Sequence, residues 1–328
     1  MSHRFVRLAL LALCLLAFPF RAPAPLIYRP GEGWSYEPVG GGAKWTRLRA
    51  KDQLDVAQAA FDRKDYSLAL KAARRVVRVW PLSDYAPQAQ YLVGRCYEGK
   101  GQDEKAFKAY QKVIDNNPKM GNYDEIVKRQ YAIANKYLAG KWFKLWGYIP
   151  IFSSMEKTSK MYEQIVKNGP FSEVGPQAQL QLGAAREKQH NYPEAVKAYE
   201  LAADRYHDRP KIASDALFKE GMAYDKQAER AEYDQSTAGH AISTFSDFMD
   251  LYPGDPRVAH AQKVIDLLKH EQARGYFETA KFYEKYHRWE GARIYYNEVV
   301  LQDPSSSYAA LAQRRIEALN ELLRPKAK

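Results

Sequence analysis

The histidine and cysteine side chains are the groups that could build an active site or a metal site, and their spacing supports neither. His270 and Glu271 begin the H-E-x-x-H pattern of zinc-dependent hydrolases, but Arg274 stands where the second histidine ligand is needed. Cys96 has no sequence cue for an activating base, and no G-x-S-x-G sequence is present. We therefore predict that the protein is not an enzyme and uses no cofactor or metal.

The charge pattern predicts no nucleic-acid partner. The formal net charge is +11 and 27% of the residues are charged, but the lysines and arginines are mixed with acidic residues throughout. A nucleic-acid site needs clustered positive charge, whatever the total. Gly40-Gly41-Gly42-Ala43-Lys44 also lacks the G-x-x-x-x-G-K-[ST] spacing of a phosphate-binding loop. This segment is interpreted as part of a tether.

Aromatic side chains gather in one short segment, KWFKLWGYIPIF, which spans residues 141–152. If it is exposed, a patch of this kind marks a contact with a membrane surface or a partner protein. The alternative is that the rings fold back and cover neighbouring helices. The candidate contact residues are Trp142, Phe143, Trp146, Tyr148 and Phe152.

The elements around this segment repeat. An Ala is followed four residues later by an aromatic residue, and three residues after that by a small, aliphatic or aromatic one. The copies are Ala106-Tyr110-Val113, Ala195-Tyr199-Ala202, Ala241-Phe245-Phe248, Ala292-Tyr296-Val299 and a weaker Ala69-Ala73-Val76. Upstream partners carry a small residue and then an aromatic one, as in Gly94 and Tyr97.

This pattern resembles the tetratricopeptide repeat, a helix-turn-helix unit of about 34 residues. Small residues allow two antiparallel helices to approach closely, and the aromatic side chain fills the space against the next pair. We predict an all-α superhelical solenoid of about six helix pairs, closed by a capping helix at Ser307 to Leu323.

The repeat spacing explains the aromatic segment. The usual interval from the small residue of the first helix to the Ala of the second is 12 residues, as from Gly94 to Ala106. From Ala134 to Thr158 it is 24, so the excess equals the length of the aromatic segment. The segment is therefore expected to be a loop that extends from the turn inside the third helix pair.

The N-terminus is typical of an exported protein. A short basic region precedes an apolar run from Leu8 to Phe18, which is too short to span a bilayer as a helix. Residues 1–24 are interpreted as a signal or anchor, residues 25–50 as a Pro/Gly-rich tether and residues 324–328 as a basic tail. Cys14 follows a lipobox-like sequence, in which Leu13 is atypical. Lipidation, simple cleavage and an uncleaved anchor all remain open.

The C-terminal half resembles the BamD family, lipoproteins of the machine that assembles β-barrel proteins in the bacterial outer membrane. The matching features lie between Gly221 and Pro304. They are Asp234-Gln235 before a repeat helix, the pair Phe282-Tyr283, and Trp289. The resemblance implies a protein on the periplasmic face of the outer membrane. Its C-terminal repeats (208–323) would dock on POTRA domains of the barrel-forming assembly protein.

The same resemblance implies that the N-terminal repeats (51–207) offer a groove to unfolded outer-membrane client proteins. First-helix side chains line the concave face of such an array. The groove candidates are Gln88, Tyr91, Arg95, Gln130, Lys136, Gln179, Gln181 and Arg186. The alternative function is a repeat adaptor of a cell-wall or other envelope complex.

Overall fold

The computed structural model describes residues 26–36, 44–119, 121–145, 149–152, 154–230 and 235–323. Within these residues the chain forms thirteen helices and two antiparallel two-stranded hairpins. It divides into two compact units, unit 1 (Met1–Gly121) and unit 2 (Asn122–Lys328). The predicted boundary at residues 207/208 stays a prediction.

Unit 1 has a hairpin followed by two helix pairs. Its elements are β1 (Leu26–Arg29), β2 (Gly33–Tyr36), α2 (Ala50–Asp62), α3 (Tyr66–Val79), α4 (Ala86–Gly99) and α5 (Asp103–Asn116). Among the four described helices of this unit, only α3 has a side-chain N-cap, in which the Asp65 carboxylate accepts from Leu68 N.

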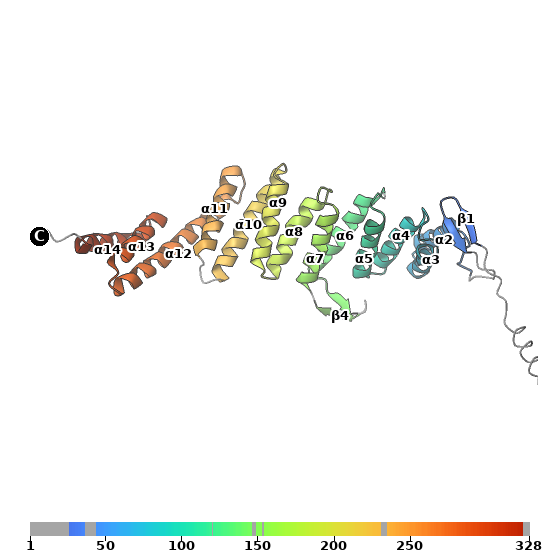
Figure 1. Cartoon of the computed structure of the whole chain (residues 1–328), viewed down its shortest axis with the longest axis horizontal. Helices are drawn as coiled ribbons and strands as arrows, with labels where there is room; N and C mark the ends of the chain where they lie inside the picture. Colours follow the sequence, from blue (N-terminus) through green and yellow to red (C-terminus); the bar gives the residue numbers. More distant parts are fainter. Residues whose placement is uncertain are drawn as a thin grey trace, which may run out of the picture. The chain divides into compact units, whose positions relative to one another are not determined.

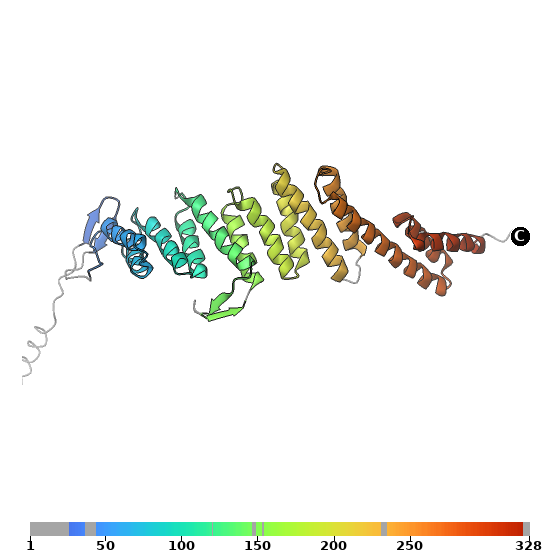
Figure 2. The same ribbon diagram turned by 180° about the vertical axis from the view of Figure 1, so that it is seen from behind.

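Unit 2 has four helix pairs, a hairpin inside the first pair, and a closing helix. The first five elements are α6 (Tyr123–Leu138), β3 (Phe143–Leu145), β4 (Ile149–Phe152), α7 (Met155–Asn168) and α8 (Gly175–Lys188). The others are α9 (Tyr192–Arg205), α10 (Pro210–Arg230), α11 (Gln235–Leu251), α12 (Val258–Lys285), α13 (Trp289–Gln302) and α14 (Ser307–Leu323). In each unit, consecutive helices lie side by side (Figures 1 and 2). The predicted all-α tetratricopeptide-repeat solenoid is confirmed.

The core contains the repeat positions that the sequence indicates. The Ala, aromatic and third positions of each copy are buried on the second helix of its pair, including Ala106, Tyr110 and Val113 on α5. The weaker copy on α3 is buried in the same way. The spacing places these side chains on one helix face, because residues three and four apart are neighbours on a helix surface.

The aromatic position packs against a glycine of the preceding helix at a distance that leaves no room for a side chain. A Cβ added at Gly183 would lie 2.3 Å from the Tyr199 ring, and one added at Gly94 would lie 2.4 Å from the Tyr110 ring. Separations below about 3 Å do not occur between carbon atoms in contact. The glycines are therefore fixed by the close approach of the two helices of a pair.

The buried tyrosines also need a hydrogen-bond partner. The Tyr110 hydroxyl donates to Glu98 at 2.7 Å, and the Tyr296 hydroxyl donates to Glu284 at 2.8 Å. Each glutamate lies twelve residues before its tyrosine, near the end of the first helix of the same pair. This polar contact ties together the two helices that the glycine brings close.

Turns inside the helix pairs share a left-handed residue. In five of the pairs, the second residue after the end of the first helix has a φ between 55° and 100°. These residues are Lys64, Gly101, Gly140, His190 and His287. A left-handed residue at this position ends a helix and reverses the chain. The sequence does not reveal this position, because only two of the five residues are glycine.

The expected tether differs from the structure at residues 26–36, which form the β1–β2 hairpin with Tyr28 opposite Trp34. Gly31 and Gly33 have φ of 74° and 75°, a conformation that glycine adopts easily and that this tight turn requires. The Gly31 carbonyl accepts from Asp84 N at 2.9 Å, and Glu32 is buried with Arg49 3.6 Å away. The hairpin is thereby attached to the helices of unit 1.

Two acidic side chains of α10, Glu220 and Asp225, are buried among the packed helices of unit 2. Glu220 on α10 is 8% exposed. Burial, and after it the nearby carboxylates Glu200, Asp204 and Asp247, together raise the pKa of its carboxyl to about 7. A protonated glutamate is therefore favoured in the folded protein up to near-neutral pH.

Replacing Gly183 with Ala is expected to lower the free energy of unfolding by about 1–3 kcal/mol, because the new methyl group overlaps the Tyr199 ring. The matched control is Gly239→Ala on α11, where nothing lies within 4 Å of an added Cβ. That change is expected to stabilise by about 0.5–1 kcal/mol, since Ala favours the helix. Urea denaturation followed by circular dichroism measures both, and equal effects would contradict the packing assignment.

Replacing Glu220 with Gln is expected to stabilise the protein at pH 8 and to change little at pH 4. The folded pKa of about 7 lies above the ordinary value of 4.5, so stability is present below pH 4.5 and is lost as the pH rises toward 7. The loss is on the order of 1–3 kcal/mol. Unfolding free energies at pH 4, 6 and 8 test this. If the unfolding free energies of the wild type and the variant change by the same amount between pH 4 and pH 8, the prediction is wrong.

Candidate interaction surfaces

The inserted aromatic segment forms the β3–β4 hairpin between α6 and α7 (Figures 1 and 2). Phe143 pairs with Phe152, Lys144 with Pro150 and Leu145 with Ile149. The interval from Ala134 to Thr158 predicted a loop at the turn of the third helix pair, and the hairpin extends from that turn.

Two aromatic residues at the base of this hairpin have opposite environments. Phe143 is 2% exposed and stacks on Tyr137 of α6, with ring centroids 4.2 Å apart. The Lys157 ammonium lies 5.0 Å from the centroid of the Phe143 ring. Trp142, in contrast, is 54% exposed. Phe143 therefore fixes the hairpin to the helices, and Trp142 is available for contact.

Of the other loop candidates, Trp146 and Tyr148 lie outside the described residues, and Phe152 is described only through its backbone pairing. Asp234 also lies outside them.

The groove candidates do not all reach the surface. Gln88 and Lys136 are exposed, while Tyr91, Arg95, Gln181 and Arg186 are half-buried. Gln130 and Gln179 are buried, so the prediction that they line a groove is wrong. The Gln179 side chain donates to the Ala198 carbonyl at 2.9 Å, and Gln130 accepts from Asn168 at 3.0 Å. Both amides hold the two helices of a pair together.

The helix phase explains this error. Gln90 donates to the Ala109 carbonyl across the same 19-residue separation that joins Gln179 to Ala198. Gln179 is therefore the equivalent of Gln90, which also faces the second helix of its pair and lies two positions from the exposed Gln88. A shift of that size turns a side chain from one helix face to another, since each residue advances the helix by about 100°.

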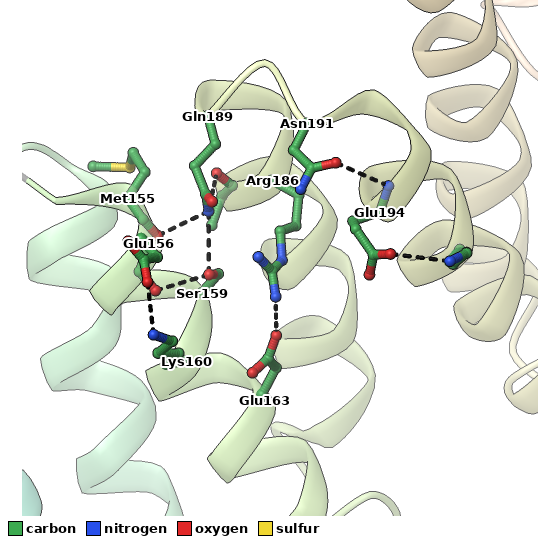
Figure 3. A network of polar contacts seen from close by, with 11 residues as sticks. Met155, Glu156, Ser159, Lys160, Glu163, Arg186, Gln189, Asn191 and Glu194 are labelled. Atoms are coloured by element: carbon green, nitrogen blue, oxygen red, sulfur yellow. Dashed lines mark hydrogen bonds and ion pairs between the residues drawn. The ribbon is translucent and has the colours of Figure 1, made fainter.

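Arg186 lies at a junction of three helices (Figure 3). Its guanidinium pairs with Glu163 of α7. Nearby, the Gln189 side chain donates to the Met155 carbonyl at 3.0 Å and to the Ser159 hydroxyl at 3.1 Å. The Gln189 contacts join the start of α7 to the end of α8. Arg186 has its own partner within the protein, Glu163.

The end of α12 carries the C-terminal aromatic surface, which we define as Phe282, Tyr283, Tyr286 and Trp289. Phe282 and Tyr286 are each 58% exposed, and their ring centroids are 4.8 Å apart. Tyr283 and Trp289 are half-buried and pack on the core of α12, α13 and α14. The surface thus has two exposed rings on a supported base.

A cavity of about 470 Å³ lies beside these rings. It is lined by Tyr283, His287, Arg288, Trp289, Glu290, Gly291 and Leu323. An open hollow next to exposed aromatic side chains is the usual form of a protein-binding hot spot. The sequence indicated three of the four aromatic residues through a family resemblance. It did not indicate Tyr286, although Tyr286 stands one helical turn after Phe282.

Gln235, the fifth family-like residue, has a structural contact. It begins α11, and its backbone carbonyl accepts from the Gln272 side chain at 3.0 Å. It therefore joins α11 to α12 and lies away from the aromatic surface defined above.

The titratable groups show no arrangement for catalysis in the described part of the chain. Cys96 is buried, and burial raises the pKa of its thiol to about 11, which disfavours the reactive thiolate. His270 lies 3.4 Å from Asp303 and against the Tyr308 ring. Among the described residues, no three His, Cys, Asp or Glu side chains are placed to hold a metal ion. No described helix has the length and apolar character needed to cross a membrane.

The fold defines a protein of the tetratricopeptide-repeat class. Residues 54–120 match the sequence model of the tetratricopeptide repeat. Residues 152–303 match that of the YfiO family, described as outer membrane lipoprotein, which is the BamD family. The two matches support a BamD-type repeat protein and indicate association with the cell envelope.

No curated protein matches the chain. Solved structures with similar helices include the C-terminal part of a repeat protein from Cytophaga hutchinsonii (14% identity, 80% of this chain and 87% of that one, TM-score 0.36). A repeat protein from Parabacteroides merdae shows 13% identity over 83% and 98% of the two chains, with a TM-score of 0.34. MamA from Desulfovibrio magneticus shows 17% identity over 63% and 97%, with a TM-score of 0.31.

Replacing Phe143 with Ala is expected to destabilise unit 2 by about 2–3 kcal/mol, because it removes a buried ring that stacks on Tyr137. Trp142→Ala is the matched control, and its effect should stay within about 0.5 kcal/mol because that side chain is exposed. Denaturant unfolding of the full chain measures both. If Trp142→Ala costs as much as Phe143→Ala, the exposed ring has a structural role instead.

Proposed function

We propose that the protein is a non-enzymatic periplasmic scaffold of outer-membrane protein assembly. It docks through its C-terminal aromatic surface on POTRA domains of the barrel-forming assembly protein. The observation that carries this proposal is the exposed pair Phe282 and Tyr286, which lies within the segment that matches an outer-membrane lipoprotein family.

The chemistry of this surface suits a folded protein partner. Two exposed rings provide apolar area at low entropic cost, and aromatic residues dominate the centres of protein interfaces. The neighbouring cavity gives a partner side chain a place to insert. Arg288 and Glu290 at its edge supply charges of both signs, so the rim can form polar contacts in addition.

The same proposal assigns client binding to the repeats nearer the N-terminus. In unit 1, Tyr91 and Arg95 are half-buried, and the Arg95 guanidinium lies 5.2 Å from the Phe61 ring centroid. Aromatic rings and a guanidinium on adjacent first helices suit an extended peptide of an unfolded barrel protein. The location on the periplasmic face of the outer membrane, with Cys14 as a possible lipidation site, belongs to this proposal.

Replacing both Phe282 and Tyr286 with Ser is expected to lower recovery of the POTRA-bearing protein at least ten-fold. The assay is a pull-down of the tagged full chain from envelope fractions in mild detergent, quantified by mass spectrometry. The matched control is Ile294→Ser with Leu301→Ser, two exposed apolar residues of α13 (56% and 73%). This control should recover the partner as wild type does.

Two outcomes would contradict the proposal. Equal loss in both double variants would show that the aromatic surface has no special role. Recovery of peptidoglycan synthases without any POTRA-bearing protein would favour the envelope-complex adaptor instead.

A further inference from the structure

Unit 1 contains a basic pocket that the proposed function does not use. It is a cavity of about 330 Å³ between α3, α4 and α5. The ten residues that line it are Arg74, Val77, Arg78, Gln90, Val93, Tyr97, Lys105, Lys108, Ala109 and Lys112. Five of them are basic and none is acidic. We refer to this cavity as the basic pocket.

The basic side chains form two opposite rims. Arg74 and Arg78 stand one turn apart on α3, a helix with four basic residues and no acidic one. Lys105, Lys108 and Lys112 stand on successive turns of α5. Like charges gathered around one hollow repel each other, and an anion bound between them removes that cost.

Three of these cations are not used by the fold. Arg78, Lys108 and Lys112 are exposed and make no hydrogen bond or ion pair with the described residues. Arg74 differs, because its guanidinium donates to the Tyr97 hydroxyl and lies over the Tyr97 ring, 5.3 Å from its centroid. Lys105 contacts Gln102 and the same Tyr97 ring.

Three apolar residues line the basic pocket, and we refer to them as its floor. Val77, Val93 and Ala109 come from three different helices. Gln90 lies at the same floor, and its side-chain amide donates to the Ala109 carbonyl at 3.1 Å, so it is already bonded. A ligand that combines an anionic head with a small apolar body therefore fits better than a fully hydrated anion.

The hairpin of the same unit has the character of a membrane interface. Tyr28 and Trp34 are paired across β1 and β2 with ring centroids 5.3 Å apart, and they are 57% and 66% exposed. Exposed Tyr and Trp are typical of segments at the headgroup level of a bilayer. Only seven residues stand between Phe18, the end of the apolar run, and Leu26. That length spans at most about 28 Å.

We propose that the basic pocket binds the phosphate headgroup of an anionic phospholipid. Guanidinium and ammonium groups recognise phosphate through charge-assisted hydrogen bonds, and the apolar floor packs against the C–H groups of the glycerol backbone and of the first acyl-chain carbons. This rests on the envelope location in the proposed function, since it needs unit 1 to lie near a bilayer. The pocket would hold unit 1 against the membrane independently of the partner surface on α12.

The test measures partition of the full chain into vesicles by sedimentation. One set contains phosphatidylcholine alone, and the other contains phosphatidylcholine with about one-fifth phosphatidylglycerol. The pocket variant combines Arg78→Gln, Lys108→Gln and Lys112→Gln. The control variant combines Lys51→Gln, Arg63→Gln and Lys71→Gln, three exposed basic residues of unit 1 outside the pocket. Both variants lose the same charge.

The expected result is that the pocket variant loses at least ten-fold of the preference for anionic over neutral vesicles, because each basic residue at an anionic surface contributes about five-fold. The control variant should lose less than three-fold. Comparing the two vesicle types cancels any binding through the apolar N-terminal run, which all variants share. The double variant Lys108→Gln, Lys112→Gln gives a smaller loss and replaces the triple variant if that one does not fold.

Three results would overturn the proposal. Equal losses in the pocket and control variants would show general electrostatic attraction. No loss in either would show that the pocket does not contact lipid. The third is micromolar binding of inorganic phosphate in a titration without vesicles, which would identify free phosphate as the ligand. The vesicles contain no assembly partner, so these results are independent of the pull-down that tests the proposed function.

Discussion

The close contact between a glycine on one helix and an aromatic ring on the next is the constraint on which the structure depends. A Cβ atom added at Gly94 or Gly183 would lie less than 3 Å from a tyrosine ring. This contact sets the distance between the two helices of a pair, and it places the ring where the next pair can cover it. Stability in such arrays is a sum of contacts within and between neighbouring pairs. A fault at one of these positions is therefore felt locally.

Polar side chains complete the pairing that the glycines permit. A tyrosine hydroxyl buried without a partner would cost about 1–3 kcal/mol, and Glu98 and Glu284 remove that cost for Tyr110 and Tyr296. The side-chain amides of Gln90 and Gln179 find their own partners in carbonyl groups of the facing helix. Much of the polar content of the helices is therefore structural. A polar residue on a repeat helix is therefore a groove candidate only if its side chain is not already bonded to the facing helix.

The surfaces that fit partners lie where this pairing leaves side chains uncovered. The C-terminal aromatic surface has exposed rings next to a cavity, and Arg78, Lys108 and Lys112 of the basic pocket are exposed and form no ion pair with the residues that the structure describes. The first belongs to the segment that matches an outer-membrane lipoprotein family, and the second belongs to unit 1. In the two proposals, protein docking is therefore assigned to unit 2 and headgroup binding to unit 1.

The sequence by itself determined the fold class, the register of the repeat and the place of the inserted hairpin, because spacings of three, four and twelve residues directly encode helix faces and pair lengths. It also indicated Phe282, Tyr283 and Trp289 by resemblance. Only the tertiary structure separated buried Phe143 from exposed Trp142, buried Gln179 from exposed Gln88, and a fixed hairpin from a tether at residues 26–36. It alone assembled the basic pocket from three helices. Burial and charge clustering depend on which helices meet, and local spacing does not carry that information.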